Sequence, residues 1–339
     1  MLDILVVGGG PVGLAAAIEA RLLGLTVAVI EPRTGEVDKA CGEGLMPGAI
    51  PALARLGVSP RGHPLRGVSY IAGASRVDHR FRDGAGLGVR RLELSAVLGA
   101  RAEELGVERM FGRVATLTQD RSSVTAAGIT ARHLLAADGL HSSVRRLCGL
   151  EVPSAPGARR YGLRRHYSVS PWSDLIEVHW TPEVEAYVTP VAHDTVGIAM
   201  LGPVGTSFDE QLARIPALAG RLRRAEPAST LRGAGPFRQR TTRRTHGRVM
   251  LVGDASGYVD AITGEGLRVG LAQAEAAVAA IAAGRPGSYE REWTRRTRDF
   301  RMLTAGLVAA AGSPLRAAIV PVAVALPRVF GAVVERLAR

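Results

Sequence analysis

Cysteine, lysine and asparagine are scarce in this chain. Cys41 and Cys148 are the two cysteines in 339 residues, which excludes a disulfide framework and a cysteine-rich zinc module. Lysine occurs once, at Lys39, and asparagine does not occur. The formal net charge is +12, but it comes from arginines spread along the chain rather than gathered around aromatic residues. We therefore expect neither a nucleic acid partner nor a bound metal.

Long hydrophobic runs are also missing. The uncharged stretches of the apolar C-terminal region, residues 302–315 and 317–327, are both well short of the ~20 residues that span a bilayer. The N-terminal apolar run lacks a preceding basic segment and soon ends in glycines, unlike a signal peptide. We expect a cytoplasmic protein. Two interpretations of residues 301–339 stay open: helices packed on the body, or helices that also contact a membrane surface.

The length and composition are those of a large globular protein. Hydrophobic residues make up 47% and charged residues 22%, which is ordinary for a packed core. A chain of this length exceeds the ~250–300 residues at which one core usually stops growing. One large domain or two closely joined domains are expected.

The N-terminal residues predict a nucleotide-binding unit. An apolar strand at residues 3–7 is followed by glycines, a helix that ends near Gly24, and a second apolar strand at residues 26–30. The glycines have the spacing GxGxxG, at Gly8, Gly10 and Gly13. These glycines allow a tight turn, close approach of a pyrophosphate, and close packing of helix on strand. Glu31, at the end of the second strand, is placed to accept hydrogen bonds from a ribose.

Two further motifs follow apolar strands. Residues 138–145 read Asp-Gly-Leu-His-Ser-Ser-Val-Arg, and Gly253-Asp254 follows the strand predicted at residues 248–252. An aspartate at a strand end can hold a sugar-like hydroxyl, and a helix N-terminus beside it can face a phosphate. Either pair alone is typical of an ordinary turn.

The three motifs in this order resemble the FAD-dependent oxidoreductases of the aromatic-hydroxylase superfamily, over residues 1–300. That superfamily includes group A flavin monooxygenases, geranylgeranyl reductases and flavin-dependent halogenases. The resemblance implies an α/β fold, a GR2-type FAD-binding Rossmann-like domain with an inserted, mostly antiparallel β-sheet substrate domain and C-terminal helices. It divides the chain into an FAD-binding domain (1–66, 90–152 and 240–300), a substrate-binding domain (67–89 and 153–239) and a C-terminal helical segment (301–339).

The resemblance also implies which residues bind the cofactor. These are Gly8, Gly10, Pro11, Val12, Gly13, Glu31, Pro32, Arg33, Cys41, Gly42, Arg91, Val114, Asp138, Gly139, Ser142, Arg145, Gly253, Asp254, Gly264, Glu265 and Gly266. Arg91 matches the family arginine on the adenosine or pyrophosphate side of FAD. Arg33 does not argue for NADPH, because its site is expected to hold the adenosine of FAD.

Departures from the family patterns bear on the reaction. Hydroxylases typically carry GDAAHxxxPxxGxGxN, and here Gly257, Ala261 and Arg268 replace its histidine, proline and asparagine. The segments Thr-Gly-Glu-Gly at 263–266 and Cys-Gly-Glu-Gly at 41–44 are more similar to geranylgeranyl reductases. The reductase substrate motif YxWxFP is matched by Glu185, Tyr187, Thr189 and Pro190. Because only the proline is kept, we expect a rebuilt substrate pocket at Tyr187, Thr189 and Pro190.

The resemblance implies an FAD-dependent oxidoreductase with NAD(P)H as electron donor and a small-molecule substrate. The leading hypothesis is a monooxygenase that acts on an apolar or aromatic molecule through a C4a-hydroperoxyflavin. A carbon–carbon double-bond reductase of the geranylgeranyl reductase type is the alternative, and a binding protein without redox activity is a third. Halogenation is disfavoured, since WxWxIP is absent and Lys39 lies in another motif. Glu43, Glu265 and Cys41 are the candidate catalytic residues, and the oligomeric state stays open.

Overall fold

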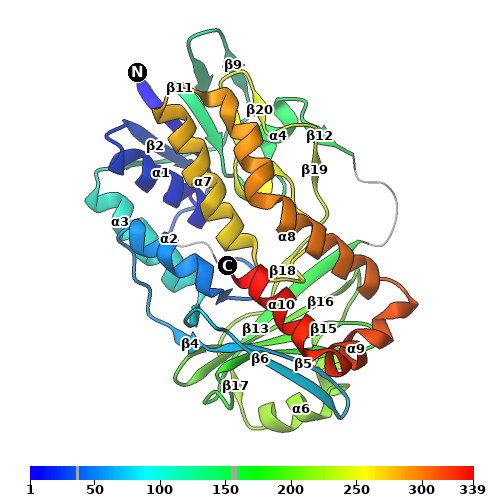
Figure 1. The fold of residues 1–339 in the computed structure, drawn as a ribbon. Coiled ribbons are helices and arrows are strands. Elements are labelled where there is room, and N and C mark those ends of the chain that lie inside the picture. The colour runs from blue at the N-terminus through cyan, green and yellow to red at the C-terminus, as the bar shows by residue number, and fades with distance from the viewer. Residues whose placement is uncertain (36–37, 154–158) are drawn as a thin grey trace.

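The structure, a computed structural model, describes residues 1–35, 38–153 and 159–339. One half of the molecule is built on a sheet with the strand order β20-β21-β11-β1-β2-β8 (Figure 1). Its parallel strands are β1 (Leu2–Val7), β2 (Val27–Glu31), β8 (Glu108–Phe111), β11 (Ile129–Ala136) and β21 (Val249–Leu251). The antiparallel additions are β20 (Thr245–His246), β9 (Leu117–Gln119) and β10 (Val124–Ala126).

Both faces of this sheet are covered, which explains why its central strands are almost entirely apolar. Ile4 and Val6 of β1 pack into a core with helices α1 (Pro11–Leu22), α3 (Arg91–Glu104) and α7 (Gly266–Ala282). The alternate residues Leu5 and Val7 pack into a second core on the other face. That core includes residues of β10 and of α4 (Ser143–Leu147). The predicted strand–glycine–helix–strand unit is therefore confirmed, with the carboxyl ends of β1, β2 and β11 at one edge.

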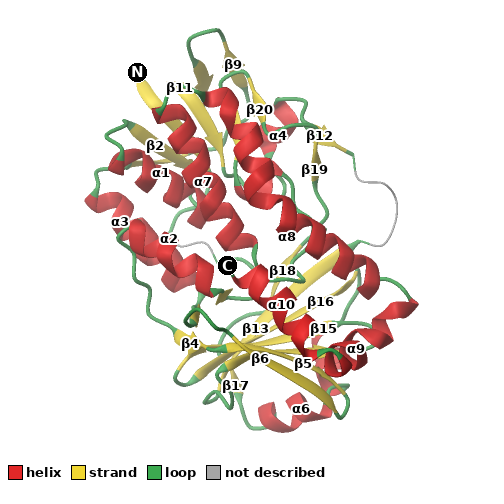
Figure 2. Cartoon of the chain, in the orientation of Figure 1, coloured by secondary structure: helices red, strands yellow, loops and turns green. Residues whose placement is uncertain are grey.

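The other half is built on a mostly antiparallel sheet with the order β17-β13-β16-β15-β14-β5-β6. Its long strands are β13 (Arg160–Ser168), β14 (Leu175–Trp180), β15 (Glu185–Ala192), β16 (Thr195–Pro203), β5 (Gly67–Ala72) and β6 (Ser75–Arg80). The short strands are β17 (Glu226–Pro227) and β18 (Arg232–Ala234). Figure 2 shows these strands below the helix-rich first half. The expected α/β fold with an inserted β-sheet is confirmed.

Smaller elements connect the two halves. Three short strands, β3 (Gly44–Leu45), β4 (His63–Leu65) and β7 (Gly86–Gly88), form a sheet of their own. The expected substrate-domain segment 67–89 thus ends in a strand that pairs outside the large antiparallel sheet. The remaining elements are η1 (Pro47–Ala49), α2 (Ile50–Arg55), β12 (Glu151–Val152), α5 (Phe208–Ala213), α6 (Pro216–Leu222), β19 (Arg240–Thr241), η2 (Gly253–Ser256) and η3 (Pro286–Ser288).

The C-terminal helices span both halves. Helix α8 (Tyr289–Ala311) packs on α7 and leads through η4 (Pro314–Ala318) to α9 (Ile319–Ala325) and α10 (Pro327–Ala338) (Figure 1). Helices α9 and α10 lie against β5 and β6. In the described parts of the chain, no single helix is long and apolar enough to cross a bilayer. The pair 286–311 and 314–325 reaches that length and composition together, with a bend of 101° between them.

Candidate functional site

The turn between β1 and α1 can only be built from glycine. Gly8 has a φ of +105°, and a Cβ there would lie 2.4 Å from the Ala137 carbonyl oxygen. A Cβ on Gly13 would lie 1.9 Å from the Gly8 carbonyl oxygen. Both distances are far below contact, so any side chain would displace the turn. Gly10 precedes α1 without a side-chain cap, which leaves the first N–H groups of the helix free to face a phosphate.

Glu31 lies directly behind this turn. Its Oε2 accepts a hydrogen bond of 2.8 Å from the Gly9 N–H, and its Oε1 lies 2.6 Å from Arg33 Nε. Burial raises the pKa of Glu31, but the hydrogen bonds from Arg33 and Gly9 outweigh burial and leave the pKa below its usual value. The side chain is therefore a carboxylate at neutral pH, which suits it to accept hydrogen bonds from ribose hydroxyls.

Lys39 belongs to the same site, although sequence reasoning gave it no role there. Its Nζ lies 3.3 Å from where a Cβ on Gly139 would stand, so the second motif and the lysine meet. Burial lowers the pKa of Lys39, the charges of Arg33 and Arg91 lower it further, and Asp254 opposes them. Three cations and the aspartate of the third motif thus converge at the carboxyl edge of the first sheet.

Arg91 and Asp254 complete this group. An Arg91 Nη2 lies 3.7 Å from where a Cβ on Gly10 would stand, so the guanidinium lies over the glycine turn. Burial raises the pKa of Asp254, although Lys39 and Arg91 act in the opposite direction. A pyrophosphate placed on the helix N-terminus would meet both cations, which is the charge arrangement that such a group requires.

The second and third motifs are joined by a buried arginine. Arg145 is fully buried and donates hydrogen bonds to the carbonyls of Ala255 (3.2 Å) and Leu140 (3.0 Å) and to Gln239 Oε1 (3.0 Å). Ser142 caps α4 by accepting from the Arg145 N–H at 2.9 Å. Arg145 therefore fixes the position of one motif relative to the other.

Several buried polar atoms in this region have no hydrogen-bond partner among the described residues. Arg91 Nε, Asp138 Oδ1 and Glu265 Oε1 are buried and make no hydrogen bond to the described residues. The other oxygen of Asp138 accepts from Ser143 Oγ and the Val144 N–H, both at 3.1 Å. Unsatisfied buried polar atoms are rare in proteins without a ligand to meet them. The glycine turn, the cations and these orphaned atoms fit a dinucleotide such as FAD.

We call the region between the three motifs, at the carboxyl edge of the first sheet, the cofactor crevice. The remaining predicted cofactor residues surround this crevice or support it. Val12 packs between Gly253 and Gly270. A Cβ added to Gly253 would lie 3.2 Å from the Val12 side chain, and a Cβ added to Gly270 would lie 2.5 Å from it. Gly42 and Gly264 face open space within the described structure, whereas Val114 is buried in the core on the far face of the sheet. Pro11 and Gly266 begin α1 and α7, and Pro32 follows β2. Contact of these residues with the cofactor stays a prediction.

Glu43 connects the cofactor crevice to the antiparallel sheet. Its Oε2 lies 2.5 Å from Nε2 of His166 on β13, and its Oε1 accepts from the Arg91 N–H at 2.8 Å. His166 Nδ1 in turn lies 2.9 Å from Ser229 Oγ and 3.2 Å from Arg164 Nη1. No local pattern in the sequence signals the contact of His166 with Glu43.

Cys41 lies beside this pair. Its Sγ accepts a weak hydrogen bond from the Glu43 N–H at 3.4 Å. Burial raises the pKa of the Cys41 thiol, opposed by Arg91 and reinforced by Glu43. The pKa of Tyr258 is raised chiefly by burial and also by Asp254 and Cys41, so Cys41 is close to the third motif as well as to Glu43. The thiol keeps its proton at neutral pH, unlike a nucleophilic cysteine.

Glu265 has the most unusual carboxyl group of the site. Burial raises its pKa to about 7, although Arg268 acts against the shift through its charge and a hydrogen bond. A carboxyl group of this kind can hold or release a proton near neutral pH. Glu43 and Glu265 are both buried. Glu43 precedes the second motif along the chain and Glu265 follows the third. Either carboxyl group is chemically able to serve as an acid or base.

The predicted substrate residues lie where the two halves meet. Tyr187 on β15 donates a 2.6 Å hydrogen bond to the carbonyl of Ile262, just after the third motif. Thr189 is buried, and its carbonyl faces Gly197, whose Cβ position lies 3.4 Å from Glu43 Oε2. The Pro190 carbonyl packs directly against Gly88. The structure thus brings this strand to the same region as Glu43 and the cofactor motifs.

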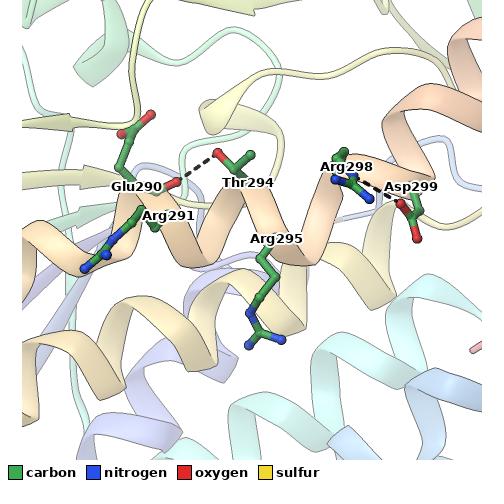
Figure 3. Close-up of a pocket in the computed structure, with 6 residues that line it drawn as sticks. All are labelled: Glu290, Arg291, Thr294, Arg295, Arg298 and Asp299. Carbon is green, nitrogen blue, oxygen red and sulfur yellow. Dashed lines mark hydrogen bonds and ion pairs between the residues drawn. The ribbon is translucent and has the colours of Figure 1, made fainter.

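A larger concave surface lies elsewhere. A pocket of about 480 Å³ runs along α8 and is lined by Glu290, Arg291, Thr294, Arg295, Arg298 and Asp299 (Figure 3). Its side chains are charged, and the Thr294 hydroxyl is bonded to the helix itself. A cavity of only about 20 Å³ opens among the motif residues Asp254, Tyr258 and Gly266. The motif region nevertheless holds the buried, strained and unpaired groups typical of a site, whereas none of the six residues that line the α8 pocket has a buried, unpaired side-chain atom.

Comparison with known proteins agrees with this geometry. The sequence profile of the FAD binding domain matches residues 1–293. The chain belongs to the FAD-binding domain family. The menaquinone reductase of Mycobacterium tuberculosis is 30% identical over 79% of this chain and 74% of its own length. Rifampicin monooxygenase of Streptomyces venezuelae is 29% identical over 81% of this chain, but over 62% of its own length.

Two further comparisons extend over most of both chains. Digeranylgeranylglycerophospholipid reductase 1 of Methanothermobacter thermautotrophicus is 27% identical over 86% of this chain and 81% of its own. The crystal structure of p-nitrophenol 4-monooxygenase from Pseudomonas putida superposes with a TM-score of 0.81 at 21% identity, over 100% of this chain and 98% of that one. The expected membership of the superfamily is confirmed. The chain is an FAD-dependent oxidoreductase, and the predicted FAD cofactor is supported.

Proposed function

We propose that this flavoenzyme reduces a carbon–carbon double bond in an apolar, isoprenoid-like substrate, with NAD(P)H as electron donor. The observation that carries the proposal is the position of Cys41. Its protonated thiol accepts a hydrogen bond from the N–H of Glu43, the residue whose carboxyl group contacts His166. The reaction needs a proton beside a hydride, and the half-buried Cys41 thiol holds one beside the buried Glu43.

The chemistry divides between cofactor and protein. When bound and reduced, FAD supplies the hydride for one alkene carbon. The other carbon takes a proton from the protein, so that the π bond breaks and two C–H bonds form. Cys41 is the proposed donor. The thiolate left behind would take a proton back from solvent by way of the neighbouring Glu43–His166 pair.

The surroundings favour an apolar substrate. Leu140, Tyr187, Tyr258 and Ala261 are half-buried and pack against one hydrophobic cluster. They come from the second motif, the substrate strand and the third motif, so they surround the place where the two halves meet. An apolar wall with a few buried polar groups is typical of a site for a hydrophobic ligand.

The relatives support the same assignment. Among the sequence relatives, the two reductases match this chain over 74% and 81% of their own lengths and rifampicin monooxygenase over 62%, while p-nitrophenol 4-monooxygenase is matched in fold over 98% of its length. The segment Cys-Gly-Glu-Gly at 41–44, which is similar to geranylgeranyl reductases, is the one that carries the proposed proton donor.

Monooxygenation of an apolar or aromatic molecule is the second candidate. It is supported by the 29% identity to rifampicin monooxygenase and by the buried apolar wall, which would exclude water from a reactive oxygen adduct. Both candidates use the same cofactor crevice and the same strand, β15.

One experiment separates them. The purified holoenzyme is supplied with NADPH or NADH and a menaquinone with an unsaturated side chain, with and without oxygen. A product that gains two hydrogen atoms in the absence of oxygen supports the reductase. A product that gains one oxygen atom, formed only in air, would support the monooxygenase instead. A protein that cannot be reconstituted with FAD would overturn both.

A matched pair of variants tests the proton donor. Cys41→Ala should lower double-bond reduction by about 10²-fold or more, the usual range for loss of a general acid, while flavin absorbance is retained. Cys148→Ala should leave the rate unchanged, because Cys148 lies in the core behind the FAD sheet. Equal rates for both variants would exclude Cys41 as the donor.

A further inference from the structure

The C-terminal helices present an apolar surface to solvent. Its large exposed side chains come from η4, α9, α10 and the residue that joins the last two, and they are Leu315, Val322, Val324, Leu326, Val329 and Val333. We call these six residues the C-terminal apolar face. Val322 is 52% exposed and Leu326 51%. Helix α9 contains no polar residue on any side, so both its buried and its exposed faces are hydrophobic. Exposed apolar side chains gathered in this way usually mark an interaction surface.

The C-terminal apolar face cannot pack against the body of the protein, because the opposite side of the same helices already does. On the opposite side of the same helices, Val320, Phe330 and Val334 are buried in the cluster that covers the antiparallel sheet. The rings of Phe330 and Tyr70 are 4.9 Å apart, and His79 Nε2 lies 2.8 Å from Glu335 Oε1. The helices are thus fixed on the sheet, and the apolar face remains outside because the inner face is already occupied.

The charge of this segment identifies the kind of partner. No aspartate or glutamate occurs from Phe300 to Val334, whereas Arg301, Arg316 and Arg328 do. Arg328 is exposed between Leu326 and Val329, within the apolar face itself. Arg316 is ion-paired with Glu185 and Arg301 lies over the Trp293 ring, so Arg328 is the cation that this face presents. Apolar side chains with an exposed cation and without an anion match the boundary between anionic headgroups and acyl chains. A two-fold contact of this face with a second copy, if centred on Arg328, would bring that arginine close to its own counterpart, and like charges disfavour that pairing.

We propose that the C-terminal apolar face docks on the surface of an anionic lipid bilayer. Helix α9 and the start of α10 lie in the headgroup region, and the rest of the molecule stays outside the bilayer. The apolar cluster beneath these helices also contacts Tyr187 and Ile262. If the proposed function holds, a membrane-dissolved isoprenoid substrate would enter from this side.

The test measures binding of the holoenzyme to vesicles. Vesicles of phosphatidylcholine, with and without phosphatidylglycerol, are sedimented with the wild-type protein and two double variants. Val322→Glu with Leu326→Glu places charges in the face. Leu22→Glu with Leu23→Glu is the control, since those leucines are similarly exposed at the end of α1, far from α9 in Figure 1. Flavin absorbance and Tm report whether each variant is folded.

The wild type and the control should bind vesicles that contain phosphatidylglycerol, and the face variant should bind at least about tenfold more weakly. Arg328→Glu should reduce binding by a similar factor and abolish the preference for the anionic lipid. Failure of the wild type to bind, or equal loss in the control, would overturn the proposal. A dimer in solution that the face variant converts to a monomer would also overturn it, because a second copy would then cover the face.

Vesicle binding is independent of the reaction catalysed. Binding without reduction of an unsaturated quinone would leave the docking surface in place and remove the proposed function. Reduction of the quinone without binding to vesicles would leave the proposed function in place and remove the docking surface.

Discussion

The Glu43 carboxylate lies 2.5 Å from the imidazole of His166, and both side chains are almost completely buried. Glu43 has a φ of +59°, a left-handed conformation that is rare outside glycine. The surrounding contacts hold it there, since the Arg91 N–H donates to the same carboxylate and the Glu43 carbonyl accepts from the Val89 N–H at 2.9 Å. A segment next to the cofactor crevice is thereby fastened to a strand of the substrate sheet.

Replacing Glu43 should impair the reaction more than the fold. Glu43→Gln removes the carboxylate that faces His166 and leaves a neutral side chain of the same size. We expect the rate of flavin reoxidation by substrate, measured anaerobically by stopped flow, to fall by about 10²-fold or more, and the pH profile of that rate to change.

The control for this variant is another buried carboxylate beside a histidine. Glu177 Oε2 lies 3.4 Å from His179 Nε2 in the substrate sheet, outside the cofactor crevice. Glu177→Gln should lower stability by about 1–3 kcal/mol and leave the pH profile unchanged. If both variants changed the profile alike, Glu43 would have only a structural role.

Removing the Glu31 carboxylate should weaken cofactor binding. Glu31→Gln loses the charge that accepts the Gly9 N–H and is placed for a ribose. A charged hydrogen bond is worth about 1.5–3 kcal/mol, so the Kd for FAD should rise by roughly 10- to 100-fold. Fluorescence quenching of FAD titrated with apoprotein measures this directly. Glu19→Gln, on the α1 side that pairs with Arg55, is the control, and an unchanged Kd for Glu31→Gln would refute the assignment.

A methyl group at Gly13 should disrupt the cofactor turn. The Cβ of alanine would lie 1.9 Å from the Gly8 carbonyl oxygen, and the turn must move to admit it. Gly13→Ala should lose FAD during purification and show a lower Tm. Gly306→Ala provides the contrast, because Gly306 lies inside α8 with open space around it; this change should raise stability by about 0.5–1 kcal/mol. Retention of FAD by Gly13→Ala would show that the turn tolerates a side chain at this position.

Glu265 should make stability depend on pH in a direction opposite to that of most carboxylates. Its pKa is raised from 4.5 to about 7 in the folded protein, so the folded state binds the proton more tightly than the unfolded state. The stabilisation is full below the unfolded pKa and is lost as the pH rises through the folded pKa. Urea unfolding of the apoprotein between about pH 5 and pH 8 should show this loss, of order 3 kcal/mol at most.

Glu265→Gln isolates that contribution. The variant cannot ionise, so its unfolding free energy should decline less with pH across the same window, and the two proteins should differ most above about pH 7. Identical pH dependence in both proteins would show that Glu265 ionises normally.

The local parts of this protein follow from the sequence by itself. The βαβ unit, the glycine turn and the aspartates at strand ends depend on residues that are neighbours along the chain. Apolar runs covered on both faces and glycines without room for a Cβ leave a direct pattern in the sequence. For the same reason the FAD crevice and the α/β fold could be predicted from three short motifs.

Only the tertiary structure decided how these parts meet. Glu43 and His166 are separated by 123 positions, and their contact depends on how the antiparallel sheet lies against the first half. Lys39 joins Gly139 and Asp254 in the crevice, and the C-terminal helices bury one face and expose another. Each outcome depends on long-range packing, in which a residue's neighbours come from distant segments. Local sequence patterns carry no record of such neighbours, because side-chain periodicity specifies a face and not what covers it.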